Sequence, residues 1–168
     1  MCVIFSGLAF VCLFANAGCQ MSGGSSTAID NDPNTVASYA RFAPVKVDIM
    51  PLTEYVGLGD ARQSEIRLYV SLLDSSGSHV KSPARFRFEL YQQVPRSSEP
   101  KGKRIKIWPH LDLNDPLKNN EYWRDFLRAY EFTLTVEQSR ERSHILQVTC
   151  MCPNGMRLSS EFTLAQPE

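Results

Sequence analysis

The stretch Ile66-Arg67-Leu68-Tyr69-Val70-Ser71-Leu72 decides the fold class. Its apolar residues occupy every second position, and side chains of a β-strand point alternately to the two faces of a sheet. One face of this segment is therefore suited to a core and the other to water. The same alternation recurs in six further segments, which gives about seven expected strands: 45–49, 86–90, 105–107, 132–136, 146–152 and 156–164.

Turn-forming residues separate these segments. Gly, Pro, Asp and Asn gather at 57–60, 74–77, 95–102 and 153–155, and Asn154-Gly155 is typical of a tight hairpin. Short strands at this spacing, each with one apolar face, are typical of two packed antiparallel sheets. We therefore expect an all-β fold, a single antiparallel β-sandwich of the immunoglobulin-like or C2-like kind, over residues 44–168.

One segment departs from the alternation. Trp123, Phe126, Leu127 and Tyr130 have the spacing of one face of a helix, and Asp115-Pro116 upstream is suited to begin it. The sequence thus predicts one short helix that closes an end of the sandwich.

Length and charge exclude several function classes. The 168 residues suffice for one domain, and 18 basic residues balance 18 acidic ones. A net charge of zero gives no general attraction for a polyanion, so we expect no nucleic-acid partner. The local signatures of a hydrolase elbow, a phosphate loop, a dinucleotide site and a zinc peptidase are absent from the sequence. We therefore expect no enzyme and no cofactor.

The first 18 residues contain no charged side chain. Residues 2–15 form an apolar run shorter than the roughly 20 residues that a membrane-spanning helix needs. The small residues Ala15-Asn16-Ala17-Gly18 follow directly. This order predicts an export signal peptide over residues 1–18.

The sequence Ala17-Gly18-Cys19 resembles the end of the lipobox of bacterial lipoproteins. The resemblance implies that Cys19 receives a diacylglycerol on its sulfur and becomes the first residue of the mature chain. It also implies a membrane contact through the lipid anchor and a place in the cell envelope, with the outer membrane favoured because Gln20 replaces an inner-membrane Asp. Cleavage after Ala17, which would release a soluble protein, is the alternative.

Residues 19–43 join the lipidation site to the sandwich. They are mostly small, polar and turn-forming, and they offer little apolar surface to offset the cost of ordering them. We expect a flexible linker that holds the domain clear of the membrane.

Cys150 and Cys152 point to the same face of their predicted strand. The favoured interpretation is that both are small core residues. A disulfide between Cys150 and Cys152 is the second interpretation, because an exported chain meets an oxidising compartment. A soft-metal site that includes Met151 or Met156 is the third.

Other candidate ligands lie in turns. We expect the histidines His79, His110 and His144 to be solvated there. Asp112 and Asp115 lie in a loop of oxygen ligands suited to Ca²⁺, although turn formation and helix capping are the favoured interpretation. We therefore predict no resident metal.

Two surface features complete the candidates. One is a pair of basic clusters, which consist of Arg85, Arg87, Lys101, Lys103, Arg104 and Lys106. Nearby acidic residues balance their charge, so we favour a solvated sheet face over a surface that binds an anionic envelope polymer or lipid. Trp108 with an exposed Tyr69 and Tyr91 suggests an aromatic ledge, though such residues more often cover a sheet.

Together these features predict a membrane-anchored lipoprotein of the cell envelope. Its sandwich would act as a non-catalytic interaction or structural module for an envelope protein or polymer. The alternative is a periplasmic carrier module that binds a small ligand, Ca²⁺ or a soft metal through the Cys150 strand or the Asp112 loop.

Overall fold

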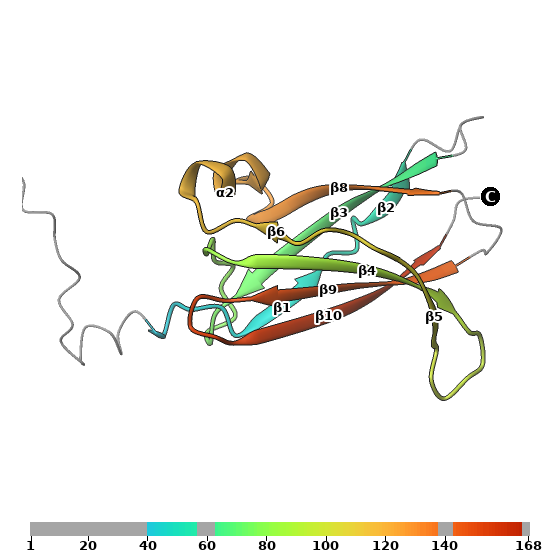
Figure 1. The fold of residues 1–168 in the computed structure, drawn as a ribbon. Coiled ribbons are helices and arrows are strands. Elements are labelled where there is room, and N and C mark those ends of the chain that lie inside the picture. Colours follow the sequence, from blue (N-terminus) through green and yellow to red (C-terminus); the bar gives the residue numbers. More distant parts are fainter. Residues whose placement is uncertain (1–39, 57–62, 138–142, 166–168) are drawn as a thin grey trace, which may run out of the picture. The chain divides into compact units, whose positions relative to one another are not determined.

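Two antiparallel sheets pack face to face in the computed structural model, which describes residues 40–56, 63–137 and 143–165 (Figure 1). Strands make up 57% of the fold and helices 7%. The expected all-β sandwich is confirmed. The predicted signal peptide, Cys19, the linker as far as residue 39 and the turn at 57–60 lie outside the described residues.

The first sheet, called sheet A, has the order β1-β3-β8-β7, with β2 also paired to β3. Its strands are β1 (Lys46–Ile49), β2 (Glu54–Val56), β3 (Gln63–Leu73), β7 (Trp123–Arg124) and β8 (Ala129–Glu137). The second sheet, sheet B, has the order β10-β9-β4-β5, with β6 also paired to β4. Its strands are β4 (Arg85–Gln93), β5 (Lys101–Ile107), β6 (Leu111–Asp112), β9 (Ser143–Met151) and β10 (Arg157–Ala165).

All seven expected segments form strands, and β2, β6 and β7 are additional. Pro51 separates β1 from β2, which both pair with β3, and Pro109 separates β5 from β6, which both pair with β4. Proline lacks the N–H that a ladder needs and is tolerated at sheet edges. Each of these edges is thus one strand interrupted by a proline.

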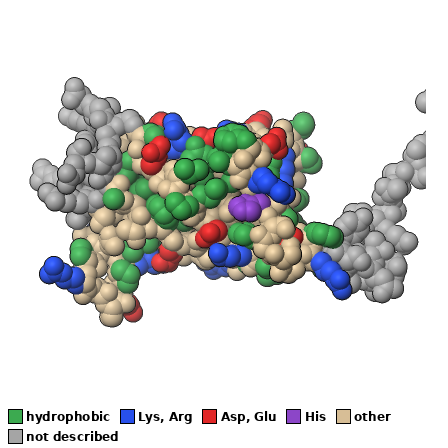
Figure 2. Space-filling view, turned by 180° about the vertical axis from the view of Figure 1, so that it is seen from behind, with side chains coloured by type: hydrophobic (Ala, Val, Ile, Leu, Met, Phe, Trp, Pro, Cys, Tyr) green, Lys and Arg blue, Asp and Glu red, His purple; other side chains and the backbone are tan. Residues whose placement is uncertain are grey.

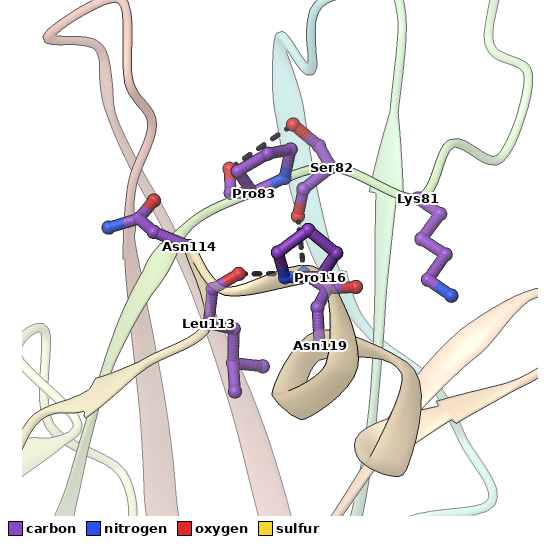
Figure 3. Close-up of a pocket in the computed structure, with 7 residues that line it drawn as sticks. All are labelled: Lys81, Ser82, Pro83, Leu113, Asn114, Pro116 and Asn119. Carbon is purple, nitrogen blue, oxygen red and sulfur yellow. Dashed lines mark hydrogen bonds between the residues drawn. The ribbon is translucent and has the colours of Figure 1, made fainter.

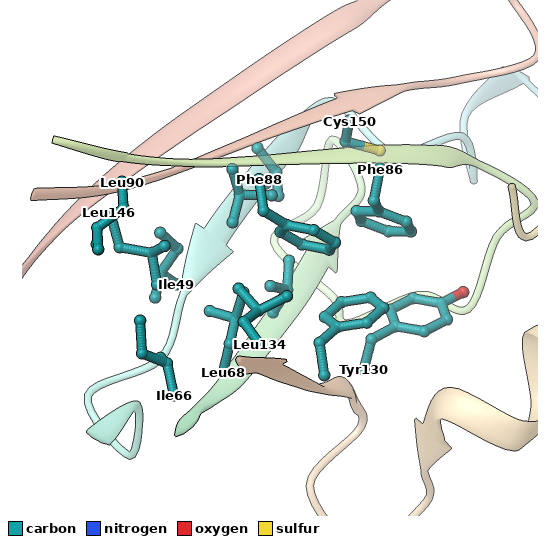
Figure 4. Packing of buried hydrophobic residues seen from close by; sticks show 14 of the residues in the cluster. Ile49, Ile66, Leu68, Phe86, Phe88, Leu90, Tyr130, Leu134, Leu146 and Cys150 are labelled. Atoms are coloured by element: carbon teal, nitrogen blue, oxygen red, sulfur yellow. The ribbon is translucent and has the colours of Figure 1, made fainter. Parts of the chain in front are cut away.

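The core lies between the sheets, as the alternation predicts. Ile66, Leu68, Val70 and Leu72 are fully buried. Figure 4 shows aromatic side chains of sheet B lying against those of sheet A. The ring centroids of Phe86 and Phe132 are 5.2 Å apart and those of Phe88 and Phe132 are 4.8 Å apart, which is within the usual range for aromatic pairs.

The hairpin between β9 and β10 has the predicted Asn154-Gly155 turn. The Gly155 amide donates to the Cys152 carbonyl (3.0 Å), and Gly155 has a φ of 81°, which favours glycine. The ladder then runs without a bulge from Arg157, opposite Met151, to Ala165, opposite Ser143.

The helix is α2 (Pro116–Tyr122), and the predicted beginning is confirmed. Asp115 caps it by accepting a hydrogen bond from the Lys118 amide (2.9 Å), and Pro116 occupies the first turn. None of the helices in the described ranges is long and apolar enough to cross a bilayer.

The prediction that Trp123 to Tyr130 lie along a helix face is wrong. These residues form β7, a turn and the start of β8, with Trp123 opposite Tyr130. Their ring centroids are 5.1 Å apart. A tight hairpin brings residues i and i+7 together just as two helical turns do. The two structures differ in where they place Phe126, which a helix face would bury but which is 83% exposed at the turn of the hairpin.

Candidate functional site

The outward face of sheet B carries four of the six basic side chains that the sequence singled out. We call it the sheet-B face. It is formed by alternate residues of four strands, because their neighbours point into the core. Its polar members include Arg85, Arg87, Glu89, Tyr91, Lys101, Arg104, Gln147, Thr149, Arg157, Ser159, Glu161 and Thr163, with Asp112 of β6 beside Arg85.

Glu89 is the centre of one hydrogen-bond group on this face. Its Oε1 accepts from Arg87 Nη2 (2.9 Å), Arg104 Nη1 (3.0 Å) and the Tyr91 hydroxyl (3.2 Å), while its side chain is only 6% exposed. Burial raises the pKa of Glu89, but the hydrogen bonds from Arg87 and Arg104 outweigh it, so the pKa lies below its ordinary value. Glu89 is therefore a buried carboxylate held ionised by two arginines.

A second group crosses the sheet from β5 to β10. Lys101 Nζ lies 4.8 Å from the ring centroid of Tyr91 and donates to Gln147 Oε1 (3.0 Å) and to Glu161. Gln147 in turn donates to Ser159 Oγ (3.1 Å). The β4–β5 ladder shifts register on both sides of Tyr91, and such bulges twist the strand. Lys101 thereby reaches two strands that are not adjacent to its own.

Two buried polar atoms at the centre of the face lack a partner among the described residues. They are Arg87 Nε and Thr149 Oγ1, which belong to directly paired residues of β4 and β9. Thr149 is 2% exposed. Because leaving a buried polar atom without a hydrogen bond is costly, such atoms call for an explanation at the site where they occur.

The two faces of the sandwich differ in charge. On the sheet-B face, cations outnumber anions: Arg85, Arg87, Lys101, Arg104 and Arg157 against Glu89, Asp112 and Glu161. On the outward face of sheet A the balance is reversed: Lys46, Arg67 and Arg124 against Asp48, Glu54, Glu65, Glu131 and Glu137. In the view of Figure 2, cationic and anionic side chains are interspersed around hydrophobic ones. The zero net charge of the chain therefore conceals an unequal distribution between the sheets.

Cys150 and Cys152 lie side by side in the core. Their sulfurs are 3.9 Å apart and both thiols are free, whereas Met151 between them is 47% exposed on the opposite face. Burial raises the pKa of both thiols. The sulfurs are farther apart than the roughly 2.05 Å of a disulfide bond, and that bond stays a prediction.

The expectation that all three histidines are solvated is wrong for His144. His110 is exposed and His79 is partly exposed, but His144 is fully buried in β9, where its Nδ1 lies 2.8 Å from the Tyr55 hydroxyl. The sequence places His144 beside a turn; the strand already begins at Ser143, so the next residue points inward.

The carboxylates of the predicted calcium loop have other partners. Asp112 pairs with Arg85 (3.1 Å) and accepts from the Asn114 amide (3.0 Å), while Asp115 caps α2. The Asn114 amide and Arg85 lower the pKa of Asp112. Within the described ranges, no group of three or more His, Cys, Asp and Glu side chains is arranged to hold a metal ion.

A cavity of about 190 Å³ lies beside the helix, lined by Lys81, Ser82, Pro83, Leu113, Asn114, Pro116 and Asn119 (Figure 3). Asn119 Nδ2 donates to the carbonyls of Leu113 (2.9 Å) and Ser82 (3.1 Å). The Tyr130 hydroxyl lies 3.2 Å from Asn119 Oδ1. Asn119 thus ties the helix to both sheets. Neither the cysteines nor Asp112 and Asp115, the residues considered for a carrier, line this cavity.

The proposed aromatic ledge is wrong. Tyr69 points outward from sheet A and Tyr91 outward from sheet B, so the two lie on opposite sides of the sandwich. Both are only partly exposed. Trp108 packs against the core and its Nε1 donates to the Thr135 carbonyl (3.0 Å), which covers the edge of β8.

Comparison with known proteins returned no matching family model, no matching curated protein and no matching solved structure. The site is therefore interpreted from its own geometry.

Proposed function

We propose that this chain is a membrane-anchored lipoprotein of the cell envelope and that its sandwich is a non-catalytic module that binds an anionic envelope polymer through the sheet-B face. The observation that carries the proposal is the excess of cations on this face, with Arg87 and Thr149 at its centre. The polymer would supply carboxylate or phosphate oxygens, for which arginine is the preferred partner.

The groups on this face are held by strands rather than loops. Arg87 and Arg104 are both fixed by Glu89, and Lys101 is fixed by Gln147 and Glu161. Side chains that are already ordered lose less entropy when they bind a ligand. Arg87 Nε is buried and has no hydrogen-bond partner among the described residues, so an acceptor that reached it after a shift of the surrounding side chains would supply one.

The anchor supports the same function. An uncharged leader that ends at Cys19 would place the chain outside the cytoplasm, and acylation there would hold it at a membrane. Residues 40–43 form a turn beside the sandwich, so the expected linker over residues 20–39 would give the domain a reach on the order of 25 Å. That reach suits contact with a polymer layer next to the membrane.

Metabolic labelling with palmitate tests the anchor. We expect label on the wild-type chain and none on the Cys19→Ser variant. A wild-type chain that carries no fatty acid would overturn the anchored form of the proposal, whatever the sheet-B face binds.

Retention on immobilised dextran sulfate, a plain polyanion, tests the face. We expect Arg85→Glu to elute at lower salt than wild type. Lys46→Glu makes the same change of charge on the outward face of sheet A and is the matched control, expected to elute nearly as wild type does. Equal losses in both variants would show that only the net charge matters and would overturn the assignment to the sheet-B face.

A further inference from the structure

The free edge of β10 differs from the other sheet edges in the described ranges. β10 is the terminal strand of sheet B, and all nine of its residues pair with β9 in one unbroken register. It contains no proline and no bulge. A long, regular edge strand presents a row of unpaired backbone groups and is a template for another strand.

The other described edges are interrupted or covered. β1 and β2 are separated at Pro51, and β5 and β6 at Pro109, with register shifts within the β4–β5 ladder. On β8, the Thr135 carbonyl accepts from Lys106 Nζ (2.7 Å) and from Trp108 Nε1 (3.0 Å). These are devices that natural sheets use to prevent edge pairing. β10 has no such interruption; β1 of sheet A lies close to it, but the two strands form no ladder within the described residues.

The phase of the ladder shows which backbone groups of β10 are free. The Cys152 amide donates to the Met156 carbonyl (2.9 Å), so Met156 and every second residue after it direct their N–H and C=O groups toward β9. The intervening residues direct theirs away from the sheet. These residues are Arg157, Ser159, Glu161, Thr163 and Ala165.

We propose that this edge pairs with β10 of a second copy of the chain, antiparallel and about a twofold axis at Ser159. In this register Arg157 lies opposite Glu161 of the second copy, and the symmetry repeats the ion pair on the other side of the axis. Within the described residues Glu161 already binds Lys101 through Oε1 and keeps Oε2 for a second cation, whereas Arg157 has no ion pair of its own.

Charge selects this register over its neighbours. An axis at Glu161 would place two carboxylates opposite each other, and like charges in directly paired positions destabilise a ladder. An axis at Ser160 would place Arg157 opposite Thr163 and would form no ion pair. Only the axis at Ser159 makes the edge complementary to itself, as a twofold interface requires.

Pairing would also cover apolar surface and extend the sheet-B face. Leu158 and Phe162 point toward the core from this edge strand and are only partly buried. The axis stands perpendicular to the sheet, so the two sheets B would join into one sheet with both outward faces on the same side. The pairing does not depend on what that face binds, and it would double the surface offered to a polymer.

Cysteine cross-linking of the full-length chain in cells tests the pairing. In the proposed register Ser159 faces its own copy at a Cα separation of about 5.5 Å, which a disulfide spans. We expect Ser159→Cys to give a covalent dimer on mild oxidation with copper phenanthroline. Thr163→Cys is the matched control, because Thr163 would face Gly155 of the second copy and no thiol. A dimer band of equal strength from both variants, or none from Ser159→Cys, would overturn the proposal.

Charge reversal in the Ser159→Cys background tests the ion pair. We expect Arg157→Glu or Glu161→Arg alone to lower the cross-linked fraction by about tenfold, since each creates two like-charge pairs by symmetry. The two changes together restore opposite charges and should recover most of the dimer. A double variant as weak as the single ones would overturn the register. An edge that pairs instead with a peptide of a different protein would leave the Ser159→Cys chain monomeric and cross-linked only to that protein.

Discussion

The hydroxyl of Tyr55 lies 2.8 Å from Nδ1 of His144, and the contact joins β2 of sheet A to β9 of sheet B. Their rings meet edge to face, with centroids 5.9 Å apart. Tyr55 is 7% exposed and His144 is fully buried. Burial raises the pKa of the Tyr55 hydroxyl, so the hydroxyl stays protonated and forms a hydrogen bond with the imidazole whose donor is set by the tautomer of His144.

Replacing Tyr55 with Phe should destabilise the fold. The change keeps the ring but removes the only hydroxyl that reaches Nδ1 from β2, and leaving a buried polar atom without that bond costs about 1–3 kcal/mol. Urea unfolding measures the loss. Tyr69→Phe is the control, since its hydroxyl meets Glu131 on the partly exposed outward face, and its cost should be under about 1 kcal/mol. Equal losses of unfolding free energy in the two variants would show that the buried Tyr55 contact stabilises the fold no more than a surface hydrogen bond does.

Glu89→Gln should destabilise the chain by about 1–3 kcal/mol near neutral pH, because Arg87 and Arg104 lose a charged acceptor. The difference from wild type should depend on pH. The folded-state pKa of Glu89 lies below its unfolded value, so its contribution is complete above pH of about 5 and is lost as the pH falls through the folded-state pKa.

Unfolding curves of wild type and Glu89→Gln across this pH range provide the measurement. The two stabilities should converge in acid. Glu161→Gln, at a carboxylate that is 45% exposed, should show a smaller difference. A gap between wild type and Glu89→Gln that widened in acid would contradict the sign of the pKa shift.

The alternation of side chains is a local property of a strand, so it places Ile66, Leu68, Val70 and Leu72 on the inward face whichever strands pair with this one. The short strands β2, β6 and β7 contain two or three residues each, too few to show a period. Their pairing depends on the long strands beside them, which the local sequence does not reveal.

The candidate site was predictable only in part. The basic residues Arg87 and Arg104 are visible in the sequence, but their shared acceptor Glu89 follows from the pairing of β4 with β5. Thr149 likewise reaches the centre of the face through its register with Arg87. The prediction that His144 is solvated is wrong because β9 begins at Ser143, which puts His144 on the same inward face as Leu146, while its partner Tyr55 lies 89 positions away in the sequence.

Phe126→Ser tests the correction at the hairpin. A helix with the predicted face would bury Phe126, and removing a buried phenylalanine costs about 3–5 kcal/mol. In the hairpin Phe126 is 83% exposed, so we expect a change within about 0.5 kcal/mol. Trp123→Ala is the comparison, because Trp123 packs against Tyr130, and it should be clearly destabilising. A large loss in Phe126→Ser would favour the helix.

Asp115→Ala should cost about 1 kcal/mol, because the Lys118 amide loses the side chain that caps α2. Asp115→Asn keeps an oxygen at the same place and should retain most of the stability. Thermal unfolding of the two variants gives the comparison. If the alanine and asparagine variants were equally unstable, the carboxylate would act through its charge and not as a cap.

The thiols of Cys150 and Cys152 should resist alkylation in the folded chain at pH 8. Both are buried, burial raises the pKa of each, and the thiolate is the reactive form. Iodoacetamide treatment before and after unfolding in urea, followed by mass spectrometry of the peptide that contains both residues, measures the protection. We expect an unmodified peptide from the folded chain and two additions after unfolding. A peptide lighter by two hydrogens that takes up iodoacetamide only after reduction would instead establish the disulfide, and the two sulfurs would then have closed from 3.9 Å to bonding distance.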